Sequence, residues 1–216
     1  MRLLEAIEIT GGLSTPSKMP CHSINTSTSA CNVGAVMRKI KGSTCEKCYA
    51  LRNNYKYPIV KAAMKRRLDG IKNKKWVEAM SFLINAYEGG AYFRWHDSGD
   101  IQSVRHMKKI VEVCNATPTV RHWLPTREYI SVNGKKAIIQ TFINAGGKIP
   151  DNLTVRLSAL MIDSQPPTSI ANQLGVQTST VSTHDGDCPA KTTANKCDTC
   201  RKCWDKTVAN VAYPKK

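Results

Sequence analysis

The sequence predicts an α/β domain with a mainly parallel sheet, open or closed as a partial (β/α) barrel, and a cysteine-rich C-terminal extension. Strand-like and helical segments alternate through the middle of the chain, and 216 residues are enough to bury one core. Four of the nine cysteines crowd into the last 30 residues. We therefore expect residues 1–186 to form the α/β domain and residues 187–216 to form a metal-binding tail packed on it.

The first regular segment is strongly basic. Between Arg52 and Lys75, nine basic residues oppose the single acid Asp69. We expect a helix that carries these residues and continues through residues 76–90. Its charge indicates either a solvated helix face or a surface that contacts phosphate groups.

Strand and helix then alternate. The first strand is predicted from its alternating aromatic and polar residues, and the helices from apolar positions at helical spacing. In order, we expect strand 91–100, helix 101–118, strand 119–128, helix 135–150 and strand 152–160. This alternation is typical of βαβ units, whose strands are parallel.

Polar side chains close two of these strands, at the edge where loops of a parallel sheet converge. His96 and Asp97 follow the first strand, and Arg127 and Glu128 follow the second. We expect these four to line one pocket, with His96 and Asp97 transferring a proton or orienting a substrate and Arg127 binding an anionic group. Each residue also has a plainer interpretation, as a satisfied loop side chain or a helix cap.

The tail carries a compact thiol motif, Cys-x-x-Cys-x-x-Cys with a more distant fourth cysteine. Spacing of two residues lets a turn aim successive sulfurs at one point, which suits tetrahedral zinc and equally an iron–sulfur cube. Three ligands in so short a run favour the cube, with zinc and free thiols as alternatives. The predicted ligands are Cys188, Cys197, Cys200 and Cys203.

A second thiol group lies early, where thirteen residues separate Cys31 from Cys45 and Cys48 follows. Three thiolates leave one corner of a cluster open, and such an iron can bind a substrate. The alternative is one four-cysteine site shared by the early pair and two tail cysteines, which zinc would accept. We leave out Cys21, in a flexible Ser/Thr-rich stretch, and Cys114, which we expect to be a small buried side chain.

Charge and compartment limit the function. A net charge of +16 with a pI of about 9.6 predicts nucleic acid or another polyanion as partner. No signal peptide or membrane-spanning run is recognisable, so we expect a cytoplasmic protein whose thiols stay reduced. Residues 169–184 have the spacing of a helix-turn-helix, and we weigh that motif against an ordinary piece of the α/β domain.

Several long motifs resemble the phage proteins grouped as gene product 88. They span most of the chain: GSTCEKCYA (42–50), FRWHDSGDIQS (93–103), WLPTRE (123–128), NLTVRLS (152–158), and CPA followed by CDTCRKCW. The first of them is also similar to the cysteine box of phage radical S-adenosylmethionine-like proteins, in which a cluster is bound just after the first strand of a partial barrel. A phage-encoded protein would work in the host cytoplasm.

The second similarity implies a [4Fe-4S] cluster on the three early cysteines and an auxiliary cluster on the tail. It implies S-adenosylmethionine less directly, because those enzymes usually space their cysteines as Cys-x-x-x-Cys-x-x-Cys and no glycine-rich cofactor loop follows here. The leading hypothesis is therefore an iron–sulfur protein, one or two clusters, with redox or radical-type chemistry. The rival is a zinc-stabilised basic module that binds nucleic acid.

Overall fold

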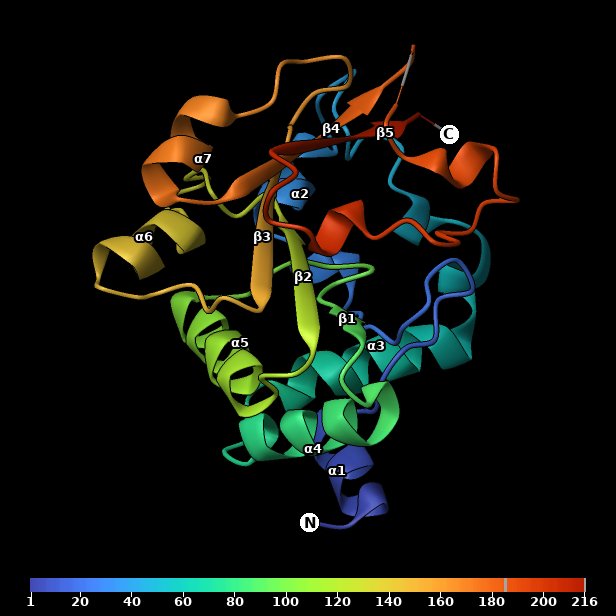
Figure 1. The fold of residues 1–216 in the computed structure, drawn as a ribbon, viewed down its shortest axis with the longest axis vertical. Helices are drawn as coiled ribbons and strands as arrows, with labels where there is room; N and C mark the ends of the chain where they lie inside the picture. Colours follow the sequence, from blue (N-terminus) through green and yellow to red (C-terminus); the bar gives the residue numbers. More distant parts are fainter. Residues whose placement is uncertain (185, 216) are drawn as a thin grey trace.

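Five parallel strands form the centre of the molecule in the computed structural model, which describes residues 1–184 and 186–215. Neighbouring strands pair in sequence order, and every pair is parallel. They are β1 (Tyr92–Arg94), β2 (Arg121–Thr126), β3 (Leu153–Ser158), β4 (Gln177–Ser182) and β5 (Asn210–Pro214). The sheet curls into an open half-barrel (Figure 1), so the predicted fold class is confirmed.

Seven α-helices and five short 3₁₀ turns surround the sheet in the described part of the chain. The helices are α1 (Leu3–Thr10), α2 (Val33–Met37), α3 (Pro58–Gly70), α4 (Trp76–Glu88), α5 (Val104–Ala116), α6 (Ile138–Asn144) and α7 (Thr168–Leu174). The 3₁₀ turns are η1 (Thr28–Ala30), η2 (Tyr49–Leu51), η3 (Asn53–Lys56), η4 (Pro189–Lys191) and η5 (Lys202–Trp204). Among the described helices, none combines the length and the hydropathy needed to cross a bilayer.

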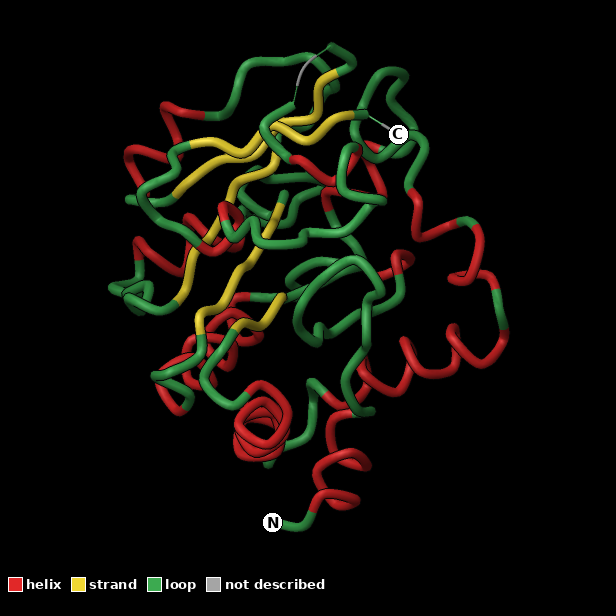
Figure 2. Tube along the Cα trace, turned by 45° about the vertical axis from the view of Figure 1, so that its right-hand side comes forward, coloured by secondary structure: helices red, strands yellow, loops and turns green. Residues whose placement is uncertain are grey.

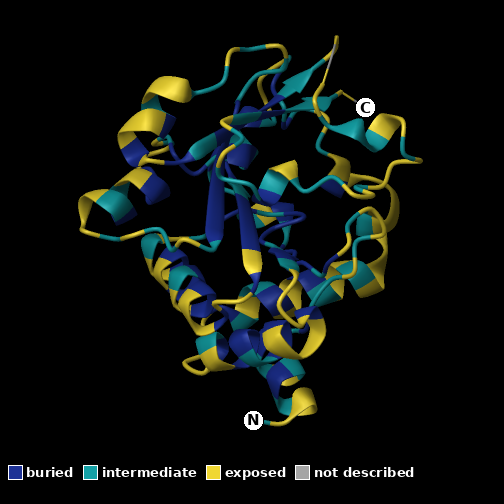
Figure 3. Cartoon of the chain, in the orientation of Figure 1, coloured by how far each residue is buried: buried dark blue, intermediate teal, exposed yellow. Residues whose placement is uncertain are grey.

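Helices α5, α6 and α7 cover one face of the sheet. Each connects two consecutive strands, as parallel pairing requires, and each contributes to the main core. Along β3, Leu153, Val155 and Leu157 alternate toward this core, and all three are fully or almost fully buried. Figure 3 shows β2 and β3 as the most deeply buried elements.

The connection from β4 to β5 takes a different route. It contains no α-helix among the described residues, and its η5 turn packs on the opposite face of β2 and β3. There Trp204 is buried against Trp123 of β2, and its Nε1 donates to the Phe93 carbonyl at 2.9 Å. Figure 2 shows this connection as loop with short helical turns, running beside the strands. The tail therefore fills the concave face of the half-barrel, while the boundary predicted at residues 186/187 stays a prediction.

One local prediction is wrong. The basic helix does not continue into the next one, because the chain breaks over residues 71–75 between α3 and α4. Lys109 of α5 donates to the Ile71 and Asn73 carbonyls there. A Cβ atom at Gly70 would lie 2.7 Å from the Ile9 carbonyl oxygen of α1, so contacts with α1 and α5 fix the turn.

Of the two interpretations of residues 169–184, the ordinary piece of the α/β domain is confirmed and the helix-turn-helix is not. Residues 168–174 form α7, but Gly175 ends that helix in a left-handed conformation and residues 177–182 form strand β4. The segment is thus an ordinary helix and strand of the α/β domain.

Candidate metal centres

Cys31 is fixed to the end of β2 through Glu128. One Glu128 oxygen accepts hydrogen bonds from the backbone amides of Asn32 and Val33, both at 3.1 Å. The other accepts from the Asn32 side chain at 3.2 Å. The residues directly after Cys31 are therefore tied to the carboxyl edge of the second strand.

Cys45 is fixed to the end of β3 through Thr44. The Thr44 amide donates to the Leu160 carbonyl at 2.9 Å, and its hydroxyl donates to the Ala159 carbonyl at 3.1 Å. The Arg127 Nε in turn donates to the Thr44 hydroxyl oxygen at 3.0 Å. Arg127 thus sits beside Cys45, and it is the cation that counteracts the effect of burial on that thiol.

Cys48 is fixed to the end of β1 through Tyr49. The Tyr49 hydroxyl donates to the Asp97 carbonyl, and the Cys48 amide closes a tight turn on the Cys45 carbonyl at 3.2 Å. The three cysteines, which we call the strand-end cysteines, are thus anchored to three neighbouring strands. Parallel strands bring those anchors to one edge of the sheet.

The sulfurs of Cys31 and Cys45 meet across Gly34, a buried residue of α2. A Cβ atom at Gly34 would lie 3.1 Å from the Cys31 Cβ, 3.6 Å from the Cys31 Sγ and 3.7 Å from the Cys45 Sγ. The bare backbone therefore leaves room between two thiols that a methyl group would fill. Cys48 is an electrostatic neighbour of Cys31 as well, so the three thiols form the donor set that a cluster held by three cysteines requires.

Carboxylates surround the strand-end cysteines. Burial, then the nearby Asp100, Cys45 and Cys48, raise the pKa of the Cys31 thiol. Burial and the Asp100 carboxylate raise the pKa of Glu128 to about 7. Asp100 itself accepts from the Thr126 hydroxyl at 2.7 Å and the Arg127 amide at 2.9 Å, so it joins the ends of β1 and β2.

His96 and Asp97 lie beneath this edge and are not hydrogen-bonded to each other. His96 is buried in a left-handed conformation, with its ring 5.4 Å from that of His106, and burial and then Arg94 lower its pKa to about 3. Neither of its ring nitrogens has a hydrogen-bond partner among the described residues. Asp97 accepts from the Ser23 hydroxyl at 2.6 Å. The predicted polar residues therefore occupy one strand edge, and their catalytic roles stay predictions.

The tail is held in place by Arg156, a fully buried residue of β3. All five bonds of its guanidinium go to backbone carbonyls, at 2.7 to 3.1 Å. The acceptors are Lys202, Cys203, Asp205 and Val208 of the tail and Thr178 of β4. One buried cation thus fixes the backbone around the last cysteine.

The tail cysteines (Cys188, Cys197, Cys200 and Cys203) are electrostatic neighbours of one another. Burial and then Cys188 raise the pKa of Cys197, which the guanidiniums of Arg94 and Arg201 oppose. Burial raises the pKa of Cys203 to about 11, against the Tyr213 hydroxyl at 3.2 Å from its sulfur and the guanidinium of Arg156. The predicted tail ligands are therefore close in space, in surroundings rich in arginine.

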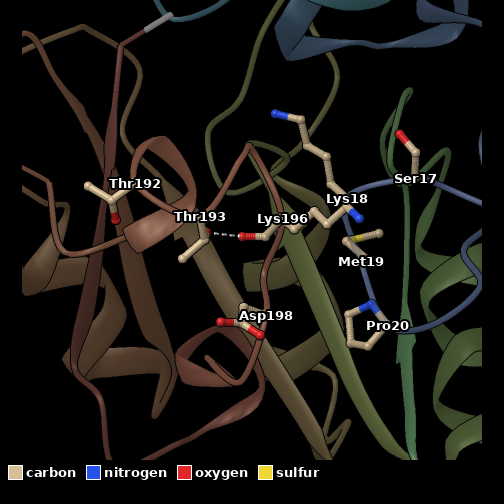
Figure 4. Close-up of a pocket in the computed structure, with 8 residues that line it drawn as sticks. All are labelled: Ser17, Lys18, Met19, Pro20, Thr192, Thr193, Lys196 and Asp198. Atoms are coloured by element: carbon tan, nitrogen blue, oxygen red, sulfur yellow. Dashed lines mark hydrogen bonds between the residues drawn. The ribbon is translucent and has the colours of Figure 1, made fainter.

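Cys21, which is not among the predicted ligands, lies beside the tail. The Cys197 amide donates to the Lys18 carbonyl at 2.8 Å and so pins the two segments together. Burial, then Glu88, raise the pKa of Cys21 to about 12, and Cys197 adds to this effect. The nearby segments 17–20 and 192–198 face each other across an open pocket of about 570 Å³ (Figure 4). Only the fold reveals this neighbour, since 175 residues separate Cys21 from Cys197 in the numbering (197 − 21 − 1).

The thiols therefore form two groups. Arg94 lies between them, within electrostatic reach of Tyr49 and Asp97 on one side and of Cys203 and Tyr213 on the other. Cys114 is fully buried in α5. In residues 1–184 and 186–215, no three His, Cys, Asp or Glu side chains are close enough as they stand to hold a metal ion. The two groups are thus neighbouring thiols and not completed coordination spheres.

Fold and site together define an open α/β half-barrel with one thiol group at its strand ends and another in its concave face. The family model described as gene product 88 matches residues 5–206. The chain belongs to this family of phage proteins. No curated protein and no solved structure matches the chain.

Proposed function

We propose that this protein binds an iron–sulfur cluster at the strand-end cysteines and carries out redox or radical-type chemistry at the corner that no cysteine occupies. The observation that carries the proposal is the anchoring of three cysteines to the ends of three adjacent strands. Each anchor is a separate hydrogen bond, from Asn32, Thr44 and Tyr49. A loop with only a structural role would not need its cysteines fixed to the ends of three adjacent strands.

Three thiols favour a cluster over structural zinc at this edge. Structural zinc sites are closed by four protein ligands, whereas a cluster with three thiolates keeps one iron open. When bound, the cluster supplies electrons and a place for a substrate atom at that iron. In radical S-adenosylmethionine-like enzymes the cluster loop follows the first strand, but here the three cysteines precede β1 in sequence. S-adenosylmethionine is therefore not part of the proposal.

The neighbouring side chains supply the remaining functions. Glu128, whose pKa is raised to about 7 by burial and by Asp100, can hold or release a proton near neutral pH. The Arg127 guanidinium is anchored at Thr44 by one nitrogen and offers its other N–H groups to an anionic substrate group. His96 stays neutral above a pH of about 3, because burial lowers its pKa, so it serves as a hydrogen-bonding group and not as a cation.

The tail cysteines are proposed to hold a second centre. Four thiols fit either an auxiliary cluster or tetrahedral zinc. Arg156 fixes the backbone of this segment independently of any metal, through bonds to four tail carbonyls. We assign it as an auxiliary cluster, with zinc as the alternative metal.

The test is anaerobic reconstitution with iron and sulfide, followed by analysis of iron, sulfide and zinc. The wild type should be brown and carry about four iron atoms for each cluster. Replacing the strand-end cysteines by alanine should remove one cluster's iron, whereas Cys114→Ala, which removes a buried thiol from α5, should remove none. Colourless protein with stoichiometric zinc and no sulfide would overturn the proposal.

A further inference from the structure

A basic and aromatic surface begins at Lys47, beside Cys48, and runs over η2, η3 and α3. Residues 47–68 contain seven basic residues and no acidic one. Six of the seven are exposed, while the seventh, Arg67, is buried and bonded to Gly12, Leu13 and Asn25. The exposed cations are Lys47, Arg52, Lys56, Lys61, Lys65 and Arg66. We call these six cations, together with Tyr49, Tyr55 and Tyr57, the basic strip.

Apolar side chains stand exposed among these cations. Tyr57 is 58% exposed, Tyr49 54%, Leu51 38% and Ile59 77%. These four are half of the eight large apolar residues exposed in the described chain, and they fall within eleven residues. Tyr49 and Tyr55 also contact each other edge to face, with ring centroids 5.8 Å apart. Among the six exposed cations, Lys65 forms an ion pair with Asp69 at 2.5 Å, and the structure shows no ion pair for the other five in the described residues. Aromatic faces presented among such cations indicate a partner that is both anionic and flat.

A membrane surface is a poorer match for the basic strip than nucleic acid is. A helix that lies on a membrane needs a continuous apolar face. On α3 the apolar Met64 points into the protein, and the exposed positions that follow Ile59 are mainly Lys61, Lys65 and Arg66. Figure 2 shows α3 along the right-hand edge of the molecule, apart from the strands.

We infer that the basic strip binds single-stranded nucleic acid, with its lysines and arginines on the phosphates and its tyrosines stacked on the bases. Bases are available for stacking in a single strand and hidden in a duplex. Tyr49 connects this surface to the site, because its hydroxyl donates to the Asp97 carbonyl while its ring stays exposed. A strand lying on Tyr49 thus reaches the strand-end cysteines. That the bound nucleic acid is the substrate rests on the proposed function, whereas the binding of nucleic acid to the basic strip does not.

The binding test uses the full chain, purified anaerobically, and a fluorescent oligothymidine of about 20 nucleotides, long enough for typical single-strand sites. Fluorescence anisotropy is measured over a range of salt concentrations. A triple variant, Lys61→Ala with Lys65→Ala and Arg66→Ala, removes three charges from α3. The matched control, Arg105→Ala with Lys108→Ala and Lys148→Ala, removes three exposed charges from α5 and the loop before β3.

The strip variant should bind more weakly, and the slope of log affinity against log salt should become shallower by about 2, since each lost phosphate contact on a single strand contributes about 0.7. Tyr57→Ala should weaken binding roughly tenfold with an unchanged salt slope, because it removes stacking and no charge. The control variant should keep the wild-type slope within about 0.5.

Three results would overturn the inference: equal losses in the strip and control variants, equal affinity for a duplex, or binding to phosphatidylserine vesicles without binding to the oligonucleotide. Iron and sulfide are measured in the same preparations. Wild-type iron content without oligonucleotide binding refutes only the role of the basic strip. Oligonucleotide binding by protein that takes up neither iron nor zinc refutes only the proposed cluster.

Discussion

The two thiol groups lie in opposite electrostatic surroundings. At the strand ends, the carboxylates of Asp100 and Glu128 lie near Cys31. In the concave face, the guanidiniums of Arg156 and Arg94 lie near Cys203. A neighbouring cation favours a thiolate and a neighbouring anion disfavours it. The tail can therefore balance several thiolates with its own arginines, whereas the strand-end group sets Arg127, beside Cys45, against two carboxylates and so depends more on the charge of the metal.

The two groups also differ in how they are built. The tail backbone is fixed from one side by Arg156, and Trp204 fills the space against Trp123. The strand-end group is anchored to three strand ends, and one of its anchors, Tyr49, has an exposed ring. A fixed backbone suits a permanent centre, whereas an exposed ring beside the thiols gives a substrate a surface to contact. Each prediction below separates the two groups.

Arg156→Met should have the largest effect. It leaves five carbonyls without their donor in a buried site, which should lower the free energy of unfolding by at least about 3 kcal/mol. The tail should lose its metal while the strand-end cluster remains. Urea unfolding and metal analysis measure both effects. Arg121→Met, at an exposed position that begins β2, is the control and should change neither.

Gly34→Ala should act on the strand-end group alone. The new methyl group would stand 3.1 Å from the Cys31 Cβ and in van der Waals contact with both sulfurs, so it would fill the space between them, and we expect a roughly 10- to 100-fold loss of affinity for the cluster. The metal-free protein should be as stable as the wild type, or more stable by up to about 1 kcal/mol, because alanine favours the helix. Iron analysis of a variant without tail cysteines reads this affinity directly. Unchanged iron content would contradict the assigned position of the cluster.

His96→Asn should alter the pH dependence of stability. In the folded chain His96 stays neutral down to a pH of about 3, because burial and Arg94 lower its pKa, while in the unfolded chain it takes a proton below about 6.5. Its contribution is present at neutral pH and is lost as the pH falls, by about 1.4 kcal/mol per pH unit. The variant should show a correspondingly shallower decline between pH 6.5 and pH 4 in urea titrations of metal-free protein.

Asparagine is chosen because it tolerates the left-handed backbone at this position. His184→Asn, at an exposed residue, is the matched control and should keep the wild-type decline. An identical slope in the His96 variant would mean that the imidazole is solvated in the folded chain.

Tyr213→Phe should have the smallest effect. It removes the hydroxyl that lies 3.2 Å from the Cys203 sulfur, which should lower the free energy of unfolding by about 1 kcal/mol. Tail-metal affinity should fall slightly and the strand-end cluster should be unaffected. A loss of strand-end iron would show that the two groups are coupled through Arg94.

Periodicity in the sequence located the central strands and helices well. The alternation along β3 and the helical spacing in α5 come from local burial, so they are legible in one sequence. The break after Gly70 was missed because it depends on Lys109 and α1, which are distant in sequence. The helix-turn-helix spacing was misleading because a helix that ends at Gly175 also precedes a strand.

The site was predictable in its residues and less so in its arrangement. Cysteine spacing identified two thiol groups, and strand-end position identified Arg127 and Glu128, which the fold places beside Cys45 and Cys31. The role of Arg156 was missed because its partners are backbone carbonyls, which leave no mark on a sequence. Cys21 was missed because its neighbour relation exists only after folding.

The central claim is that three cysteines at the ends of three strands hold a cluster without help from the tail. Its most direct test is electron paramagnetic resonance of reduced protein in which every tail cysteine is replaced by Ser, after anaerobic reconstitution. We predict a [4Fe-4S] signal with about four iron atoms per chain, lost when Cys45→Ala is added. A variant that takes up zinc or no metal, and gives no signal, would contradict the account.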